Sequence, residues 1–190
     1  MSDVGTRVWE GVTIPTPGTF SLDTAHTRVG FWVRHLMVSK VRGRFAEFSG
    51  GITVAEDPLQ STAELTIKTS SIDTGQPQRD DDLRTGNFLD IEKYPEITFR
   101  GTRVASHDGP VLTVVGDLTI KDVTRPVELE VELEGVIANP WGKQVLGYSI
   151  SGEIDREDFG ITYNMALEAG GVMIGKIIKL EIEGEAVRDD

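Results

Sequence analysis

Apolar and charged residues alternate strictly from Val127 to Glu134, where the sequence reads VELEVELE. Successive side chains of a β-strand point to opposite faces, so this stretch places its aliphatic residues on one face and its four glutamates on the other. On an α-helix the same glutamates would be spread around the circumference. The segment is therefore predicted to be a strand with one buried face and one face in solvent.

The same period of two recurs along most of the chain. Turn sequences such as HDGP at 107–110 and NPWG at 139–142 separate the alternating segments. About eight strands with no long helix between them favour an antiparallel all-β domain. The further strands are expected at residues 28–36, 51–54, 63–68, 97–101, 111–120, 145–154 and 176–187.

Residues 78–95, QRDDDLRTGNFLDIEKYP, lack this alternation. Three consecutive aspartates suit the first turn of a helix, because acidic groups oppose the helix dipole there. We therefore predict a short helical insertion around residues 78–92, which Pro95 follows.

The length of 190 residues fits a single domain. Residues 1–17, which include Pro15 and Pro17, are expected to form a flexible N-terminal arm, and residues 18–190 the β-barrel domain. The first fifteen residues contain no apolar run like that of a signal peptide, so a cytoplasmic location is expected.

The chain carries 31 acidic and 19 basic residues, which gives a formal net charge of −12. Nucleic acids and anionic lipid surfaces repel such a charge, so we expect no nucleic-acid partner. The absence of cysteine excludes disulfides, thiolate metal sites and cysteine nucleophiles. The sequence contains no run of about 18 apolar residues, the length that would predict a transmembrane helix. Stable membrane insertion is therefore not expected.

A sheet with one apolar face must bury it, either by stacking on a second sheet or by closing into a barrel. Long strands favour the barrel, and the interior of an eight-stranded barrel is either filled by side chains or holds one small ligand. Periodicity leaves both alternatives open. A hollow barrel would favour an apolar chain, since each buried methylene is worth about 0.8 kcal/mol.

The residues on the expected interior face are the candidates for contact with such a ligand. They are mostly aliphatic, with three aromatic members and one histidine. The candidates are Phe31, Val33, His35, Leu65, Ile67, Phe99, Leu129, Val131, Leu133, Tyr148, Ile150, Leu180 and Ile182.

Few polar residues suggest chemistry. His35 shares the interior face, where it would contact a ligand head group or else serve as a structural histidine bonded to the backbone. Arg79 and Arg84 are candidates for a phosphate head group, because a guanidinium binds such groups bidentately; the alternative is surface salt bridges with Asp80–Asp82. Arg156 is expected to pair with a carboxylate; the alternative is contact with a ligand.

The three histidines are dispersed, which predicts no metal site. His26 is expected to organise a turn, and His107 to be solvated in another. The chain contains no nucleophile elbow, P-loop or dinucleotide fingerprint. We therefore predict a protein that is not an enzyme and uses no cofactor.

Sequence blocks spread from Thr19 to Val187 carry a family resemblance. Their order and spacing resemble the YceI-like family of lipocalin-like polyisoprenoid-binding proteins. The blocks are FSLDTAHTRVGFWVRHLMVSKVRGRFAEFSGGI at 20–52, SSIDTG at 70–75, RDDDLRTGNFLDIEKYPEITF at 79–99, GDLTIKDVTRPVEL at 116–129, NPWG at 139–142, IDREDFGI at 154–161 and KLEIEGEA at 179–186.

The resemblance implies an eight-stranded antiparallel lipocalin-like barrel with a helical segment. It also implies a hydrophobic tunnel for a long isoprenoid or similar amphiphilic lipid, and a homodimer. Binding, sequestration or transport of that lipid is the expected function; the alternatives are an enzyme or accessory protein acting on it, or a filled-barrel structural or stress-associated dimer. The chain departs from the family pattern in two blocks: Lys121–Asp122 replace a pair that is usually His-Gly, and Asp82 replaces a residue that is usually histidine.

Overall fold

A computed structural model describes residues 5–190 of the chain and consists mainly of antiparallel strands. The strands are β1 (Thr6–Trp9), β2 (Val12–Pro15), β3 (Gly18–Leu22), β4 (Arg28–His35), β5 (Ser39–Phe45), β6 (Phe48–Val54), β7 (Thr62–Lys68), β8 (Ile72–Asp73), β9 (Glu96–Asp108), β10 (Val111–Ile120), β11 (Val123–Ala138), β12 (Gln144–Asp155) and β13 (Ile174–Arg188). The α-helix is α1 (Pro77–Arg84), and short 3-10 helices are η1 (Pro58–Gln60), η2 (Thr69–Ser71) and η3 (Arg156–Phe159).

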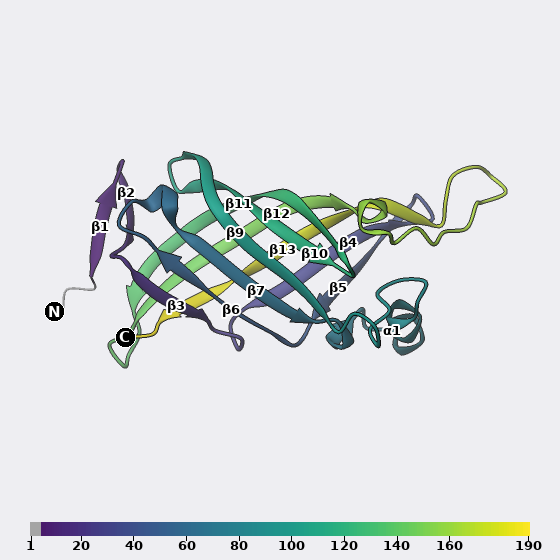
Figure 1. Cartoon of the computed structure of the whole chain (residues 1–190), viewed down its shortest axis with the longest axis horizontal. Helices are drawn as coiled ribbons and strands as arrows, with labels where there is room; N and C mark the ends of the chain where they lie inside the picture. Colours follow the sequence, from purple (N-terminus) through teal and green to yellow (C-terminus); the bar gives the residue numbers. More distant parts are fainter. Residues whose placement is uncertain (1–4) are drawn as a thin grey trace.

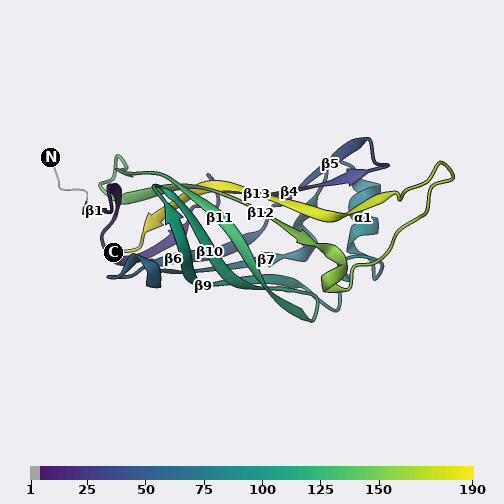
Figure 2. The same ribbon diagram turned by 90° about the horizontal axis from the view of Figure 1, so that it is seen from above.

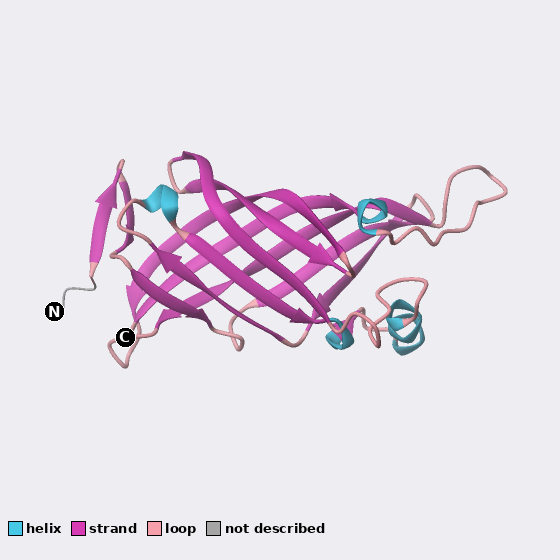
Figure 3. Ribbon diagram, in the orientation of Figure 1, coloured by secondary structure: helices cyan, strands magenta, loops and turns pink. Residues whose placement is uncertain are grey.

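Eight strands close into a barrel. Their hydrogen-bonded order is β12, β11, β10, β9, β7, β6, β3 and β13, and β13 pairs back with β12. All of these pairs are antiparallel, and the crossed strands of the wall are visible in Figures 1 and 3. The predicted all-β, eight-stranded antiparallel barrel is confirmed.

One edge of β13 holds two partners in succession. Its last residues, from Ala186 to Arg188, pair with β3, whereas the region from Ile174 to Glu183 pairs with β4. Strand β4 continues into a hairpin with β5, and β5 pairs with the short β8. The β4–β5 hairpin therefore extends the wall at one end of the barrel, beside α1 (Figure 2).

Strand β11 shows why alternation predicts this fold. Leu129 is 7% exposed and faces the interior, while the neighbouring Glu128, Glu130 and Glu132 are exposed. A closed wall has only two environments, and the period of two assigns each side chain to one of them.

Helix α1 starts where the sequence can cap it. The Gln76 side chain accepts hydrogen bonds from the backbone N–H groups of Gln78 and Arg79, and Asp80 lies in the first turn. The helix ends at Arg84, and the Thr85 hydroxyl donates to the carbonyl of Asp82. The rest of the insertion predicted around 78–92 consists of turns rather than helix.

The N-terminal hairpin β1–β2 covers the other end of the barrel (Figure 1). Arg7 donates to the carbonyls of Ala55 and Glu56, and Ile14 is 3% exposed. Residues 1–4 of the expected flexible arm lie outside the described residues, and the domain boundary at residue 17 stays a prediction.

The expectation of a solvated His107 is wrong. Its Nε2 lies 2.9 Å from the Glu10 carboxylate, and its ring packs 4.2 Å from that of Trp9. Both partners belong to the β1–β2 hairpin and its turn, 97 or more positions earlier in the chain, so no local pattern around His107 reveals them.

Candidate ligand-binding cavity

A cavity of about 520 Å³ lies inside the barrel. This volume is within the range of about 300–1,000 Å³ that is usual for small-molecule sites. Its wall is predominantly aliphatic and aromatic, and it is formed by strands on all sides of the barrel. The structure therefore favours the hollow barrel over the filled one.

Every interior residue that the sequence nominated lines this cavity. The set comprises Phe31, Val33, His35, Leu65, Ile67, Phe99, Leu129, Val131, Leu133, Tyr148, Ile150, Leu180 and Ile182. Their contact with a ligand stays a prediction.

Sequence reasoning missed the residues that line the two ends of the cavity. Trp9 and Ile14 line it from the β1–β2 hairpin, and Leu83, Phe88 and Tyr163 line it at the opposite end. Trp9 and Ile14 lie in two strands of four residues each, which are too short for an alternating pattern to stand out. Leu83 lies in α1, and Phe88 and Tyr163 lie in irregular segments, where a period of two gives no signal.

Two glycines keep aromatic rings against the wall. A Cβ atom on Gly43 would lie 2.4 Å from Cζ of Phe31, and one on Gly116 would lie 2.4 Å from Cζ of Phe99. Each ring therefore occupies the space above a residue without a side chain on the neighbouring strand. The two rings therefore lie against the barrel wall and leave the centre of the barrel open.

His35 lies at the end of β4, where it lines the cavity. Among the described residues, its imidazole forms no hydrogen bond and no ion pair, so the structure gives it no structural partner. A polar ring at the margin of an apolar cavity is suited to contact a head group.

The two candidate arginines differ. The Arg79 side chain lines the cavity and donates to the hydroxyl and carbonyl of Thr74. Arg84 does not line the cavity within the described chain; it donates to the carbonyls of Ser70 and Ile72 and pairs with Asp81 at 3.1 Å. The salt-bridge alternative thus describes Arg84, whereas Arg79 is directed to a threonine beside the cavity.

Tyr148 provides a polar group within the wall. It is 3% exposed, and its hydroxyl lies 3.4 Å from the Thr27 hydroxyl. Burial raises the pKa of this phenol, so the ring stays neutral and acts as a hydrogen-bonding group.

Arg156 holds the base of the loop between η3 and β13. The guanidinium is buried and donates to the backbone carbonyls of Ile161, Tyr163 and Gly175 at 2.7–3.0 Å. A fourth, longer bond reaches the carbonyl of Ile174 at 3.5 Å. The expected carboxylate partner is therefore wrong, because four backbone acceptors surround the side chain instead.

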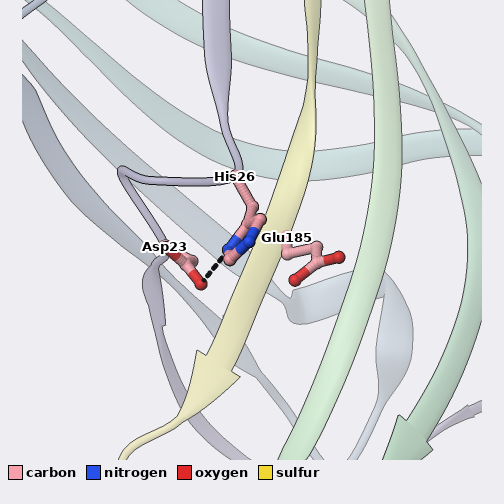
Figure 4. Close-up of side chains that lie close together, drawn as sticks. All are labelled: Asp23, His26 and Glu185. Atoms are coloured by element: carbon pink, nitrogen blue, oxygen red, sulfur yellow. Dashed lines mark hydrogen bonds and ion pairs between the residues drawn. The ribbon is translucent and has the colours of Figure 1, made fainter. Parts of the chain in front are cut away.

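Asp23, His26 and Glu185 come together on the outside of the barrel (Figure 4). Their potential ligand atoms lie within 4.8 Å of one another. The Asp23 carboxylate accepts a hydrogen bond from His26 Nδ1 at 2.8 Å and another from the N–H of Ala25. These bonds organise the turn between β3 and β4, as the sequence predicted for His26, and the 65% exposed His26 side chain leaves the group open to water.

We expect the His26 ion pair to be visible in a titration. The hydrogen bond to Asp23, followed by the charges of Asp23 and Glu185, raises the pKa of His26, while the same hydrogen bond lowers the pKa of Asp23. The pair therefore stabilises the fold between these two pKa values and loses its effect as pH rises through that of His26 or falls through that of Asp23. The His26 midpoint in an NMR titration should lie above the ordinary value of about 6.5.

The Asp23→Asn variant should lower that midpoint, and Glu185→Gln should lower it less, because Glu185 acts only through its charge. Equal midpoints in wild type and Asp23→Asn would contradict the ion pair.

The YceI-like domain model matches residues 20–186. The chain belongs to the YceI-like family. A UPF0312 protein of Staphylococcus aureus is 42% identical to it over 172 residues, which cover 87% of this chain and 95% of that protein. The resemblance seen in the sequence blocks is thereby confirmed.

Solved structures share the fold of this YceI-like chain. The YceI protein of Campylobacter jejuni is 34% identical, with a TM-score of 0.69 over 89% of this chain and 97% of that one. BcnA of Burkholderia cenocepacia gives a TM-score of 0.75 at 21% identity and covers 86% of this chain and 98% of its own. A domain of Saccharophagus degradans described as polyisoprenoid binding gives 0.66 at 17% identity, over 89% and 98%.

Proposed function

We propose that this protein binds and then sequesters or carries a long-chain isoprenoid or a similar amphiphilic lipid, without catalysing a reaction. The observation that carries the proposal is the apolar cavity of about 520 Å³ inside the closed barrel. Burial of a hydrocarbon chain there would remove it from water at about 0.8 kcal/mol per methylene. The description of the related Saccharophagus degradans domain as polyisoprenoid binding supports an isoprenoid as the ligand class.

The polar residues at the α1 end indicate where the head group would lie. His35 and Arg79 line the cavity there, and the Arg79 guanidinium already donates to Thr74 beside the cavity. Arg84 would have to exchange Asp81 for the head group. We therefore place the head group between β4 and α1 and the tail along the barrel toward Trp9 and Ile14.

The described part of the chain contains no helix that is long and apolar enough to cross a bilayer. The homodimer and the cytoplasmic location stay predictions.

Lipid extraction tests the proposal. Protein purified without harsh detergent should yield a co-purifying lipid in mass spectrometry, or should take up a polyprenyl phosphate added in mild detergent. Repeated recovery of empty protein that also fails to take up the added lipid would overturn the proposed function.

The Val131→Trp variant should lower the affinity for the polyprenyl phosphate by at least tenfold, about 1.4 kcal/mol. Val131 lines the cavity from β11 and pairs with Leu112 and Ile150, so an indole at this position would occupy space meant for the tail. Intrinsic fluorescence or native mass spectrometry would measure the affinity. Glu130→Gln, on the solvent face of the same strand, is the matched control and should bind as wild type does; equal affinities of all three proteins would contradict a tail in this cavity.

A further inference from the structure

Two exposed apolar loops lie side by side at the α1 end of the barrel. At the turn between β4 and β5, Leu36, Met37 and Val38 are 41%, 58% and 79% exposed. Met165, in the loop between η3 and β13, is 54% exposed. The N–H of Leu36 donates to the carbonyl of Met173 at 2.8 Å, which joins the two loops. Figure 2 shows both at the end of the molecule away from β1.

The loops hold their apolar side chains outward by defined backbone geometry. Leu36 and Met37 have φ angles of 50° and 63°, a left-handed conformation that non-glycine residues seldom adopt, least of all twice in succession. In the second loop, Met173 donates to Met165 at 2.9 Å and Leu167 accepts from Gly170 at 3.0 Å. Such a conformation persists only where the surrounding structure maintains it, and it is concentrated at functional positions.

The hairpin that carries the first loop is basic. Residues 24–46 contain five basic residues and no acidic residue, in a chain that has 31 acidic ones. Arg34, Lys40 and Arg42 form no ion pair with the described carboxylates. Lys40 Nζ lies 4.0 Å and the Arg34 guanidinium 5.8 Å from the centre of the Trp32 ring, so two cations flank an aromatic side chain just behind the apolar turn.

The same surface adjoins the cavity. Arg34, His35, Tyr163 and Met173 all line the cavity and belong to the two loops or to the residues next to them. The apolar loops therefore lie at the end of the cavity where we place the lipid head group.

We propose that this loop pair docks on the surface of an anionic lipid bilayer. Leu36, Met37, Val38 and Met165 would enter the boundary between head groups and acyl chains, while Arg34, Lys40 and Arg42 face the lipid phosphates. An aromatic residue beside basic ones behind an apolar tip is the arrangement that suits a membrane interface. Net charge describes the whole surface, whereas docking depends on this hairpin, whose residues 24–46 include five basic and no acidic residues despite the total of −12.

A second copy of the chain fits this surface less well. A symmetric dimer contact brings the same patch of both subunits together, so the basic hairpin would meet its own copy. The resulting repulsion between like charges favours the bilayer as the occupant.

Vesicle sedimentation tests the docking surface with the full chain. The protein is mixed with vesicles of phosphatidylcholine, with or without phosphatidylserine, and the pelleted fraction is measured. Wild type should bind the phosphatidylserine vesicles more strongly, and added salt should weaken that binding.

The double variant Met37→Ser/Val38→Ser should bind at least tenfold more weakly, since it removes two exposed apolar side chains. The double variant Lys40→Glu/Arg42→Glu should lose a similar factor in affinity for vesicles that contain phosphatidylserine, and its affinity for pure phosphatidylcholine vesicles should not change.

Trp141→Ser is the matched control, because Trp141 is 85% exposed in the β11–β12 turn at the opposite end. Unchanged vesicle binding by this control supports the assigned surface, and an equal loss would overturn it. Absence of wild-type binding to either vesicle would also overturn it, as would a dimer that the Met37→Ser/Val38→Ser change dissociates without vesicles present.

Uptake of polyprenyl phosphate from detergent separates this proposal from the proposed function. The loop variants should keep that uptake, because detergent presents the lipid without a bilayer. A wild-type protein that takes up the lipid from detergent but ignores vesicles would refute docking and leave the proposed function standing.

Discussion

Leu129→Asp is expected to prevent the chain from reaching its native structure. Leu129 is 7% exposed and lies in the central part of β11, where it faces an apolar cavity and the rest of the barrel wall. Truncation of a buried leucine alone costs about 2–5 kcal/mol. An aspartate adds the cost of a polar or charged group without a partner, so the loss approaches the whole stability of about 5–15 kcal/mol that domains possess.

Soluble yield, circular dichroism and urea unfolding would measure the effect. Glu128→Gln is the control on the adjacent position, because that side chain is exposed and should change stability by no more than about 0.5 kcal/mol. A Leu129→Asp protein with the urea midpoint of wild type would contradict the assignment of this face to the interior.

Phe20→Ala should destabilise the protein by about 3–5 kcal/mol, the usual loss when a packed phenylalanine is truncated. Phe20 is 1% exposed and packs with Leu146, Tyr148 and Ala186, where the surrounding side chains cannot fill the space it would leave. Urea unfolding with a common slope would measure the difference in the free energy of unfolding.

Phe31→Ala is the matched comparison and should cost less. Phe31 is only partly buried and lines the cavity, so part of its ring already faces space that no side chain fills. Added lipid should widen the difference in the free energy of unfolding between wild type and Phe31→Ala, because a ligand that binds only the folded state stabilises that state. Equal losses for the two variants, with no effect of lipid, would favour a filled barrel.

The strands and the cavity wall could be predicted because each depends on a local rule. In β11 and β13 the alternation alone assigns Leu129 and Leu180 to the interior. The ends of the barrel obey no such rule. His107 meets Glu10, and Leu36 meets Met173, across separations in the chain that no period connects.

The hydrogen-bond partners of Arg156 could not be predicted from the sequence either. Its sequence neighbours Asp155 and Glu157 suggest an ion pair, yet the guanidinium turns to the carbonyls of Ile161, Tyr163 and Gly175. Backbone acceptors have no signature in a sequence, so a partner of this kind emerges only from the folded chain. The basic character of residues 24–46 was present in the sequence but hidden by the total charge.

The β1–β2 hairpin across one end of the barrel has a consequence for how the proposed lipid would enter and leave. With Trp9 and Ile14 lining the cavity at that end, the proposed lipid would enter and leave at the other end, beside α1. The tip of its tail would then be the first part to enter and the last to leave. Release would begin at the head group, one chain segment at a time, so residence time should lengthen with each added isoprene unit.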